Sequence, residues 1–475
     1  MVLLGFALLL LRARGMSLWI DEDFTVRNAG QPTLAAVVGA VEATERRPPL
    51  SFILFHGWFA LFPGLEWAWR WLPAAWTVLA IAASVPLAER VRRGSGVMAA
   101  TLLALSPFLL LYGPMLRAYS LTLLLGLLLT LAVLRERPRS YAALAVVGVW
   151  TDYVIWPLVA AHALWRLWPG SAHVGKRHWW AAFAVVGAST LPLLGAVLEQ
   201  SGRDMIASDL ATSPLGVLLK LGYPAYAYLL GETLFPWSPL AWLGMLGGAV
   251  ALLGLWRPTR AVGLLVLSAL VPLLGIVALL TVVATDLPFV NVPSRAIVAA
   301  PLVLVGLAAG LTRLPRRAAL PALALLLAAS AASVTNLFTG ESYINPIYAV
   351  PAREIAMRIG AQAAPEAVVI ADSDTLLSRY LVEPRPLATD DPAALEAIRA
   401  DTAEVWLLTF GRDRTRVLDP DAEVRQALEA AGWRQVEQHL YVLQDPFYRR
   451  LKTRLFGREA YEAKATLERW QQEEK

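Results

Sequence analysis

The sequence has no cysteine and little charge. The absence of cysteine excludes disulfides, thiolate catalysis and cysteine-bound metals. Only 17% of its 475 residues are charged, whereas 57% are hydrophobic, and the mean hydropathy is +0.53. These values exclude a disordered chain and are atypical of a soluble globular protein. The composition therefore predicts a polytopic membrane protein.

The few charges are distributed unevenly along the chain. Residues 1–337 carry 24 Lys and Arg against 14 Asp and Glu, while residues 338–475 carry 18 against 23. This change in composition predicts two domains that face different solvents. We expect a transmembrane domain at 1–340, with an external loop at 17–68, and a small soluble domain at 345–475.

Apolar runs recur as far as residue 337, most of them close to the roughly 20 residues that a helix needs to cross a bilayer. About eleven transmembrane helices are predicted, at 1–16, 69–89, 96–112, 118–134, 140–152, 153–168, 179–198, 238–256, 261–283, 295–312 and 318–337. The fifth and sixth are interpreted as a hairpin that turns near Asp152, because one continuous helix would reverse the side of every later loop.

Five basic clusters between these spans all fall on one side of the membrane. They hold 14 basic residues against two acidic ones. By the positive-inside rule this side is the cytoplasm. We therefore expect a multi-pass protein of the plasma or inner membrane, with a cytoplasmic amino terminus and an extracytoplasmic carboxy-terminal domain. The first span has no basic leader and no small-residue cleavage site, which favours an uncleaved anchor.

Two external loops are too long to be simple turns. In the first, 31–43 has helical spacing of apolar residues with Thr33 as a cap, and two prolines open a second apolar segment at 50–62. Both segments are predicted to be helices that lie on the outer interface. The second external loop, 199–237, holds several charged residues, Lys220 and Glu232 among them.

The tail after about residue 345 alternates between helix and strand patterns. Its spacing predicts helices at 352–363, 392–399 and 422–431 and strands at 367–371, 404–408 and 439–443. This is the pattern of a small α/β domain. The tail has neither a glycine-rich phosphate loop nor a metal-spaced cluster of His, Asp and Glu, so a structural or acceptor-binding role is expected.

Three consecutive acids, Asp21, Glu22 and Asp23, follow Trp19 at the outer exit of the first span. Adjacent carboxylates repel one another, so one of them is expected to hold a proton more tightly, and the cluster attracts a cation or a proton donor. This chemistry suits a general base. The alternative is a solvated acidic cluster at the start of a helix.

Isolated ionisable residues stand on the same outer side. Arg46 and Arg47 open the second interfacial helix, and a planar guanidinium can bind phosphate through two hydrogen bonds. Arg117, with no acid nearby in sequence, and Arg295 each need an anion from the protein or from a ligand. The alternatives are that the first pair only marks the interface and that the other two reach lipid phosphate. Asp152, between two apolar segments, is a further candidate acid.

An ordered series of short motifs resembles the family 39 glycosyltransferases of the GT-C superfamily, which includes protein O-mannosyltransferases and the aminoarabinose transferase that modifies lipid A. The motifs are SLWIDEDFT at 17–25, RPPLSFILFHGW at 47–58, RWLPA at 70–74, ALSPFLLLYGPMLRAYSL at 104–121, TDY at 151–153 and SR at 294–295. The resemblance covers about the first 340 residues and is strongest in the first 155.

This resemblance implies a GT-C-like fold and transfer of a monosaccharide from a polyprenyl-phosphate donor to an acceptor hydroxyl on the extracytoplasmic side, with inversion at the anomeric carbon. It implies that Asp21, with Glu22 beside it, deprotonates the acceptor. The phosphate leaving group would be held by Arg117, Tyr119 and Arg295. The acceptor class stays open between a glycan, a lipid and a protein, and no nucleic-acid partner is expected.

The chain departs from the family at four positions. Arg47 replaces a usual His and is counted here among the donor-phosphate ligands, Met115 replaces an acid, Asp152 replaces a His, and Ala296 replaces a Tyr. Some relatives bind a divalent metal through an acid and a His. No cofactor is therefore predicted, metal dependence stays open, and Asp152 is a candidate replacement acid.

Two other functional classes are weighed against a transferase. One is a transporter or flippase of a lipid-linked or anionic glycan, and the other is a structural subunit that binds partners through its tail. The chain shows no repeated pair of interrupted helices in matching halves, and its ionisable residues gather on one face, which disfavours a transporter.

Overall fold

The computed structural model describes residues 1–45, 47–167, 176–195, 213–282, 289–372, 375–384, 386–388, 396, 402, 404–410, 420–443, 450, 454 and 463–472. The chain divides into two compact units. The first comprises Met1–Gly15 and Phe24–Phe338, and the second comprises Met16–Asp23 and Thr339–Lys475. The acidic segment near the amino terminus therefore belongs to the same unit as the carboxy-terminal region.

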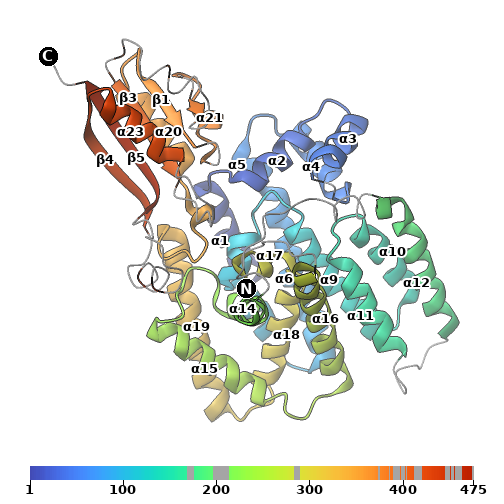
Figure 1. The fold of residues 1–475 in the computed structure, drawn as a ribbon. Helices are drawn as coiled ribbons and strands as arrows, with labels where there is room; N and C mark the ends of the chain where they lie inside the picture. Colours follow the sequence, from blue (N-terminus) through green and yellow to red (C-terminus); the bar gives the residue numbers. More distant parts are fainter. Residues whose placement is uncertain are drawn as a thin grey trace. The chain divides into compact units, whose positions relative to one another are not determined.

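The first unit is built of helices (Figure 1). Its amino-terminal half contains α1 (Val2–Gly15), α2 (Ile20–Ala29, whose first turn belongs to the second unit), α3 (Leu34–Thr44), α4 (Leu50–Leu61), α5 (Glu66–Trp69), α6 (Trp71–Val91), α7 (Gly96–Ala104), α8 (Pro107–Tyr112) and α9 (Tyr119–Leu134). The remainder contains α10 (Pro138–Val149), α11 (Ile155–Leu167), α12 (Lys176–Thr190), η1 (Leu191–Leu193), α14 (Pro214–Leu230), α15 (Pro239–Leu253), α16 (Arg260–Val282), η2 (Phe289–Asn291), α17 (Val292–Arg295), α18 (Ala299–Leu311) and α19 (Arg316–Thr339).

Every one of the eleven predicted spans contains a helix. Within the described residues, three helices are individually long and apolar enough to cross a membrane, and five spans result if each of two bent helix pairs counts as one. The predicted polytopic helical fold is thus confirmed, while the number of eleven crossings stays a prediction. The hairpin near Asp152 is present, because α10 ends at Val149 and α11 begins at Ile155.

The centre of this unit is formed by α6, α9 and α18, which pack against one another. Along α9 and α18 nearly every side chain is buried, as expected for helices that are apolar on all sides. By contrast, α15 and α16 leave leucines such as Leu246 and Leu274 about half exposed. Such faces suit contact with lipid tails.

The helix boundaries follow local sequence signals. Ser106 accepts a hydrogen bond from the Leu109 amide, and Pro107 occupies the first turn of α8, so the predicted span at 96–112 is broken into α7 and α8. Thr33 caps α3 through the Ala36 amide, as the sequence predicted. The two expected interfacial segments correspond to α3 and α4 and pack together through Val37 and Phe52.

The longest described helix that was not predicted is α14 (Pro214–Leu230). The second external loop, expected at 199–237, contains α14, which ends at Gly231 with a φ of +79°. Glycine adopts this backbone conformation without steric cost. The loop residues 196–212 lie outside the described part of the chain.

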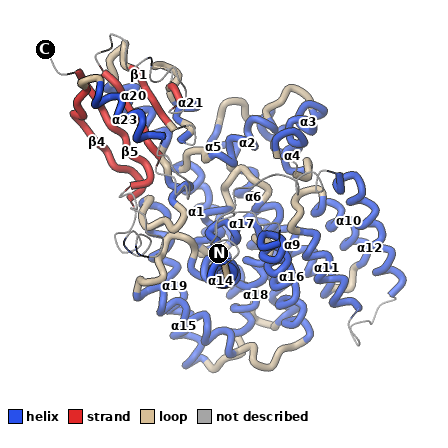
Figure 2. Tube along the Cα trace, in the orientation of Figure 1, coloured by secondary structure: helices blue, strands red, loops and turns tan. Residues whose placement is uncertain are grey.

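The second unit contains a five-stranded sheet with helices on both faces (Figure 2). Its elements are η3 (Pro346–Ala349), α20 (Ala352–Gln362), β1 (Val368–Ala371), α21 (Leu377–Tyr380), β2 (Leu387–Ala388), β3 (Glu404–Phe410), α23 (Pro420–Ala430), β4 (Trp433–Leu443) and β5 (Ala463–Gln472). The strand order is β2-β1-β3-β5-β4, with β1 parallel to β2 and β3, and β5 antiparallel to β3 and β4.

The alternation of side chains along β3 builds two cores. Trp406 and Leu408 pack with α20, whereas Val405 and Leu407 face the opposite side and pack with α23. The predicted small α/β domain is therefore confirmed. The helix expected at 392–399 lies outside the described residues, apart from Glu396, which is helical.

Candidate functional site

Arg117 is buried between α8 and α9 and is paired with an acid. Its two terminal nitrogens reach the two carboxylate oxygens of Glu45 at 2.5 and 2.9 Å, and Nη1 also donates to the Thr25 hydroxyl at 3.1 Å. The sequence predicted that Arg117 binds an anion, either a carboxylate of the protein or a ligand. The structure supplies it from the residue that follows α3, 72 positions away in sequence.

The same carboxylate also binds Arg47. The Nε atom of Arg47 lies 3.2 Å from Oε2 of Glu45. Burial by itself would raise the pKa of Glu45, but the charge and hydrogen bonds of Arg117 and the charge of Arg47 outweigh it and hold this pKa below its ordinary value. Glu45 is therefore a carboxylate that bridges two guanidinium groups. Sequence analysis did not single it out.

A small cavity adjoins the two guanidiniums and has room for about one water molecule. Its walls combine polar groups with the apolar face of α4, and the lining residues are Thr25, Arg47, Ser51, Phe52, Phe55, Arg117, Ala118 and Thr151. Four of the motifs named above, at 17–25, 47–58, 104–121 and 151–153, thus contribute residues to one cavity.

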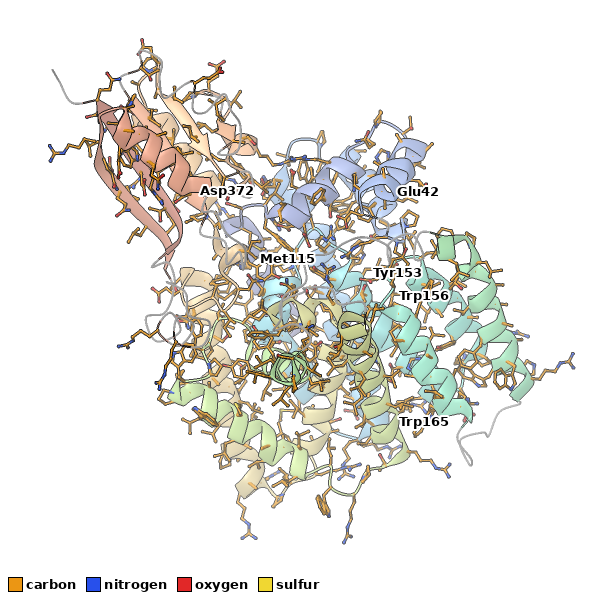
Figure 3. The ribbon with its side chains drawn as sticks, in the orientation of Figure 1. Glu42, Met115, Tyr153, Trp156, Trp165 and Asp372 are labelled. Atoms are coloured by element: carbon orange, nitrogen blue, oxygen red, sulfur yellow. The ribbon has the colours of Figure 1, made fainter. Side chains whose placement is uncertain are left out.

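The start of α4 is fixed to the turn between α10 and α11. The Leu50 amide donates to the carbonyl of Trp150 at 3.1 Å. Tyr153 in this turn is half-buried. Tyr153 packs edge-on against Trp156, and both are labelled in Figure 3.

The predicted acid Asp152 is half-buried and has a local task. Its Oδ1 atom accepts a hydrogen bond from the Val154 amide at 3.2 Å, which stabilises the turn between α10 and α11. A direct part in catalysis stays a prediction for this residue.

Tyr119 begins α9 and is buried. Its ring packs edge-on against Tyr112, with centroids 5.4 Å apart, and the Tyr112 hydroxyl donates to Glu232 at 3.1 Å. Glu232 lies in the loop between α14 and α15 and is 1% exposed. Burial raises its pKa to about 8, although the hydrogen bond from Tyr112 opposes the shift. In the sequence, Glu232 stands out only as one of several charged residues of the second external loop.

Arg295 ends α17 at a sharp break in the chain and is half-buried. The segment Phe289–Arg295 and the following α18 are bent by 81°. The Tyr228 hydroxyl donates to the carbonyls of Pro293 and Ala296 and so fixes the backbone on both sides of Arg295. The structure therefore brings Arg47 and Arg117 to one carboxylate, while Arg295 lies at the bend between α17 and α18.

The predicted catalytic acids belong to the second unit and differ in environment. Glu22 is fully buried and accepts the Trp19 amide through Oε2 at 3.4 Å, so it caps the first turn of α2. Asp23 is also buried. Asp21 is half-buried and is the most exposed residue of the three. Within the described residues, no group of three or more His, Asp and Glu could hold a metal ion.

The structure was compared with solved structures of other proteins, and similar ones include two crystal structures of one transferase. The structure is similar to the crystal structure of ArnT from Cupriavidus metallidurans in the apo state, with a TM-score of 0.53 and 12% identity over 98% of this chain and 96% of ArnT. The chain has a GT-C-like membrane fold. The structure of the same ArnT bound to undecaprenyl phosphate gives a TM-score of 0.51 and 13% identity over 98% of this chain and 97% of ArnT. No family model and no curated protein matches the sequence.

These similarities confirm the fold that the sequence predicted, a polytopic helical membrane fold that is GT-C-like. Membership of family 39 stays a prediction. The roles of the individual site residues likewise stay predictions.

Proposed function

We propose that this protein is an integral membrane glycosyltransferase that transfers a monosaccharide from a polyprenyl-phosphate donor to an acceptor hydroxyl. The observation that carries the proposal is the convergence of Arg47 and Arg117 on a single buried anion. Two fixed guanidiniums at one place can bind a phosphate through charge-assisted hydrogen bonds. The similarity to an ArnT that binds undecaprenyl phosphate supports a lipid phosphate as the ligand.

The chemistry requires a base and an electrostatic partner for the leaving group. In the proposed reaction the Asp21 carboxylate takes the proton of the acceptor hydroxyl, whose oxygen forms a bond to the anomeric carbon. The bond from that carbon to the phosphate oxygen breaks, and polyprenyl phosphate leaves with the electron pair. Arg117 and Arg47 stabilise the charge that grows on the phosphate, which lowers the barrier.

Attack from the face opposite the departing phosphate inverts the configuration at the anomeric carbon. Tyr119 and Arg295 are proposed as further ligands of the donor phosphate, and Glu22 as the residue that shapes the loop around the base. Asp152 is proposed to hold the turn beside Arg47. The acceptor is a glycan, a lipid or a protein of the cell envelope.

Glu45 occupies the two guanidiniums in this structure. A donor phosphate would accept hydrogen bonds from the same two guanidiniums, and the cavity beside these guanidiniums has room for only about one water molecule. Donor binding therefore requires Glu45 to move away from Arg117 or to share it. The proposed site is a closed form that opens when the lipid phosphate enters.

The orientation proposed from the basic clusters places the reaction outside the cytoplasm. In this arrangement the amino terminus is cytoplasmic, the carboxy-terminal domain is extracytoplasmic and the lipid donor enters from the bilayer of the plasma or inner membrane.

The proposal is tested by incubating the purified full-length protein in detergent with a labelled polyprenyl-phosphate sugar and a cell-envelope extract as acceptor. A transferase releases polyprenyl phosphate without a sealed compartment. A transporter or flippase changes nothing in detergent and acts only across the membrane of a vesicle, which would contradict the proposal.

A further inference from the structure

The acidic segment Met16–Asp23 is held to the sheet domain by several different contacts, all within the second unit. They are the ion pair of Asp23 with Arg379 at 2.7 Å, the hydrogen bond from the Leu18 amide to the Tyr380 hydroxyl at 2.8 Å, the hydrogen bond from the Arg353 amide to the Ser17 hydroxyl at 3.3 Å, and the edge-on contact of Trp19 with Tyr348 at 4.8 Å between centroids.

The ion pair carries the strongest constraint. The Asp23 side chain is 5% exposed, and a buried carboxylate is costly without a partner of opposite charge. Arg379 supplies that charge through Nη1, with its side chain 29% exposed. Removal of Arg379 would leave Asp23 buried without the cation that Arg379 provides, so the first turn of α2 would have to move.

Tyr380 constrains the other end of the segment. Its hydroxyl accepts the Leu18 amide, just before α2 begins, and the guanidinium of Arg353 lies over its ring at 5.4 Å from the centroid. Leu18 and Asp23 bracket Asp21 in the sequence. Two adjacent residues of α21 thus hold the acidic segment on both sides of the proposed base.

Helix α21, which carries Arg379 and Tyr380, is anchored at the end of strand β1. Asp372, labelled in Figure 3, follows β1, and its carbonyl accepts the Thr375 hydroxyl at 2.6 Å in the turn that leads into α21. The Asp372 amide in turn donates to the carbonyl of Leu408 in β3. Arg379 and Tyr380 are therefore anchored on the central strands of the sheet.

We propose that Arg379 and Tyr380 are positioning residues that hold the Asp21 carboxylate in its reactive geometry, an inference that rests on the proposed function. The carboxy-terminal domain then completes the catalytic loop by fixing the segment that carries the base. A general base must lie within hydrogen-bond reach of the proton that it takes, so a small displacement of this segment slows the chemical step more than it weakens binding.

The test compares two arginine variants of the full-length protein. Arg379→Ala breaks the ion pair with Asp23. Arg425→Ala breaks a matched ion pair with Glu468, in which the nitrogen–oxygen distance is 3.0 Å and the side chains of Arg425 and Glu468 are 29% and 3% exposed. Both variants leave a buried carboxylate without its arginine in the same domain. Arg379→Ala is expected to lower kcat by about tenfold to 100-fold, with KM for the donor changed less than threefold. Arg425→Ala is expected to leave kcat unchanged, and Arg379→Lys to recover part of the loss. Equal kcat in the two alanine variants would overturn the proposal.

Amide hydrogen exchange separates this inference from the proposed function. Residues 18–23 are expected to lose protection in Arg379→Ala and in Tyr380→Phe but to keep it in Arg425→Ala. Equal protection of this segment in all three variants overturns the positioning role, whether or not the protein is active. A wild-type protein that releases no polyprenyl phosphate overturns the proposed function, while the exchange data still decide whether Arg379 and Tyr380 hold the segment.

Discussion

The guanidinium of Arg117 and the carboxylate of Glu45 form a two-point ion pair inside the helical unit, with nitrogen–oxygen distances of 2.5 and 2.9 Å. The side chains are 3% and 9% exposed, so the pair is largely shielded from water. A cation that is proposed to bind donor phosphate is therefore already neutralised by the protein. This pair makes Glu45 a competitor of the donor.

Replacing Glu45 by Gln should increase the affinity for polyprenyl phosphate by about tenfold, because the competing charge is removed while an oxygen remains to orient Arg117. Replacing Arg117 by Ala should weaken the affinity by at least about tenfold. Binding of labelled undecaprenyl phosphate to the detergent-solubilised protein measures both.

A matched control for Glu45→Gln is Glu66→Gln. Glu66 lies 3.8 Å from the buried Arg70, but neither residue lines the cavity. Glu66→Gln should leave the lipid affinity unchanged. Weaker binding in Glu45→Gln would show that Glu45 orients the arginines for the donor instead of competing with it.

The Glu45 pair also predicts a pH dependence of stability. Because the pKa of Glu45 is lower in the folded protein than its ordinary value of 4.5, the carboxylate stabilises the fold fully above that pH. This contribution is lost as the pH falls through the folded pKa. Thermal unfolding of the wild type and Glu45→Gln should differ most at neutral pH, and the difference should shrink below pH 4.5. A constant difference down to pH 3 would contradict the assigned pairing.

Glu232 predicts a pH dependence of stability with the opposite sign. Its pKa is raised to about 8 by burial, so the folded protein holds a proton that the unfolded chain releases near pH 4.5. The stability that depends on this proton should be fully present below that pH, should decrease as the pH rises to about 8 and should then level off.

Glu232→Gln keeps a hydrogen-bond acceptor for the Tyr112 hydroxyl but cannot ionise. Its midpoint of thermal unfolding should therefore change less between pH 5 and 9 than that of the wild type. Parallel pH profiles for the two proteins would contradict a raised pKa for this carboxyl.

The sequence was sufficient to predict the helical segments because their apolar runs are continuous and local. It was not sufficient for α14, whose tyrosines, Lys220 and internal Pro224 interrupt such a run. The strand β5 was also missed, since Glu468 and Arg469 are charged residues in a strand that lies between β3 and β4. Their partners, Arg425 and Glu404, lie 43 and 65 positions away, and this compensation is invisible to a local pattern.

The candidate site shows the same division. The motifs that contain Arg47 and Arg117 could be recognised in the sequence. The role of Glu45 could not, because it depends on the contact between the end of α3 and the loop before α9. In the same way, three adjacent acids looked equivalent in sequence. The fold gives Glu22 a capping role and Asp23 an arginine partner. The Glu22 contact is local, with Trp19 only three positions away, whereas the arginine partner of Asp23 lies 356 positions away in sequence.

The most direct test of the account is the release of polyprenyl phosphate from a labelled polyprenyl-phosphate sugar by the purified wild type, Asp21→Asn and Glu22→Gln in detergent. We expect release by the wild type, and none above background by Asp21→Asn with an unchanged unfolding temperature. Partial release is predicted for Glu22→Gln, whose amide oxygen can still accept the Trp19 amide. Wild-type rates in Asp21→Asn would contradict the account.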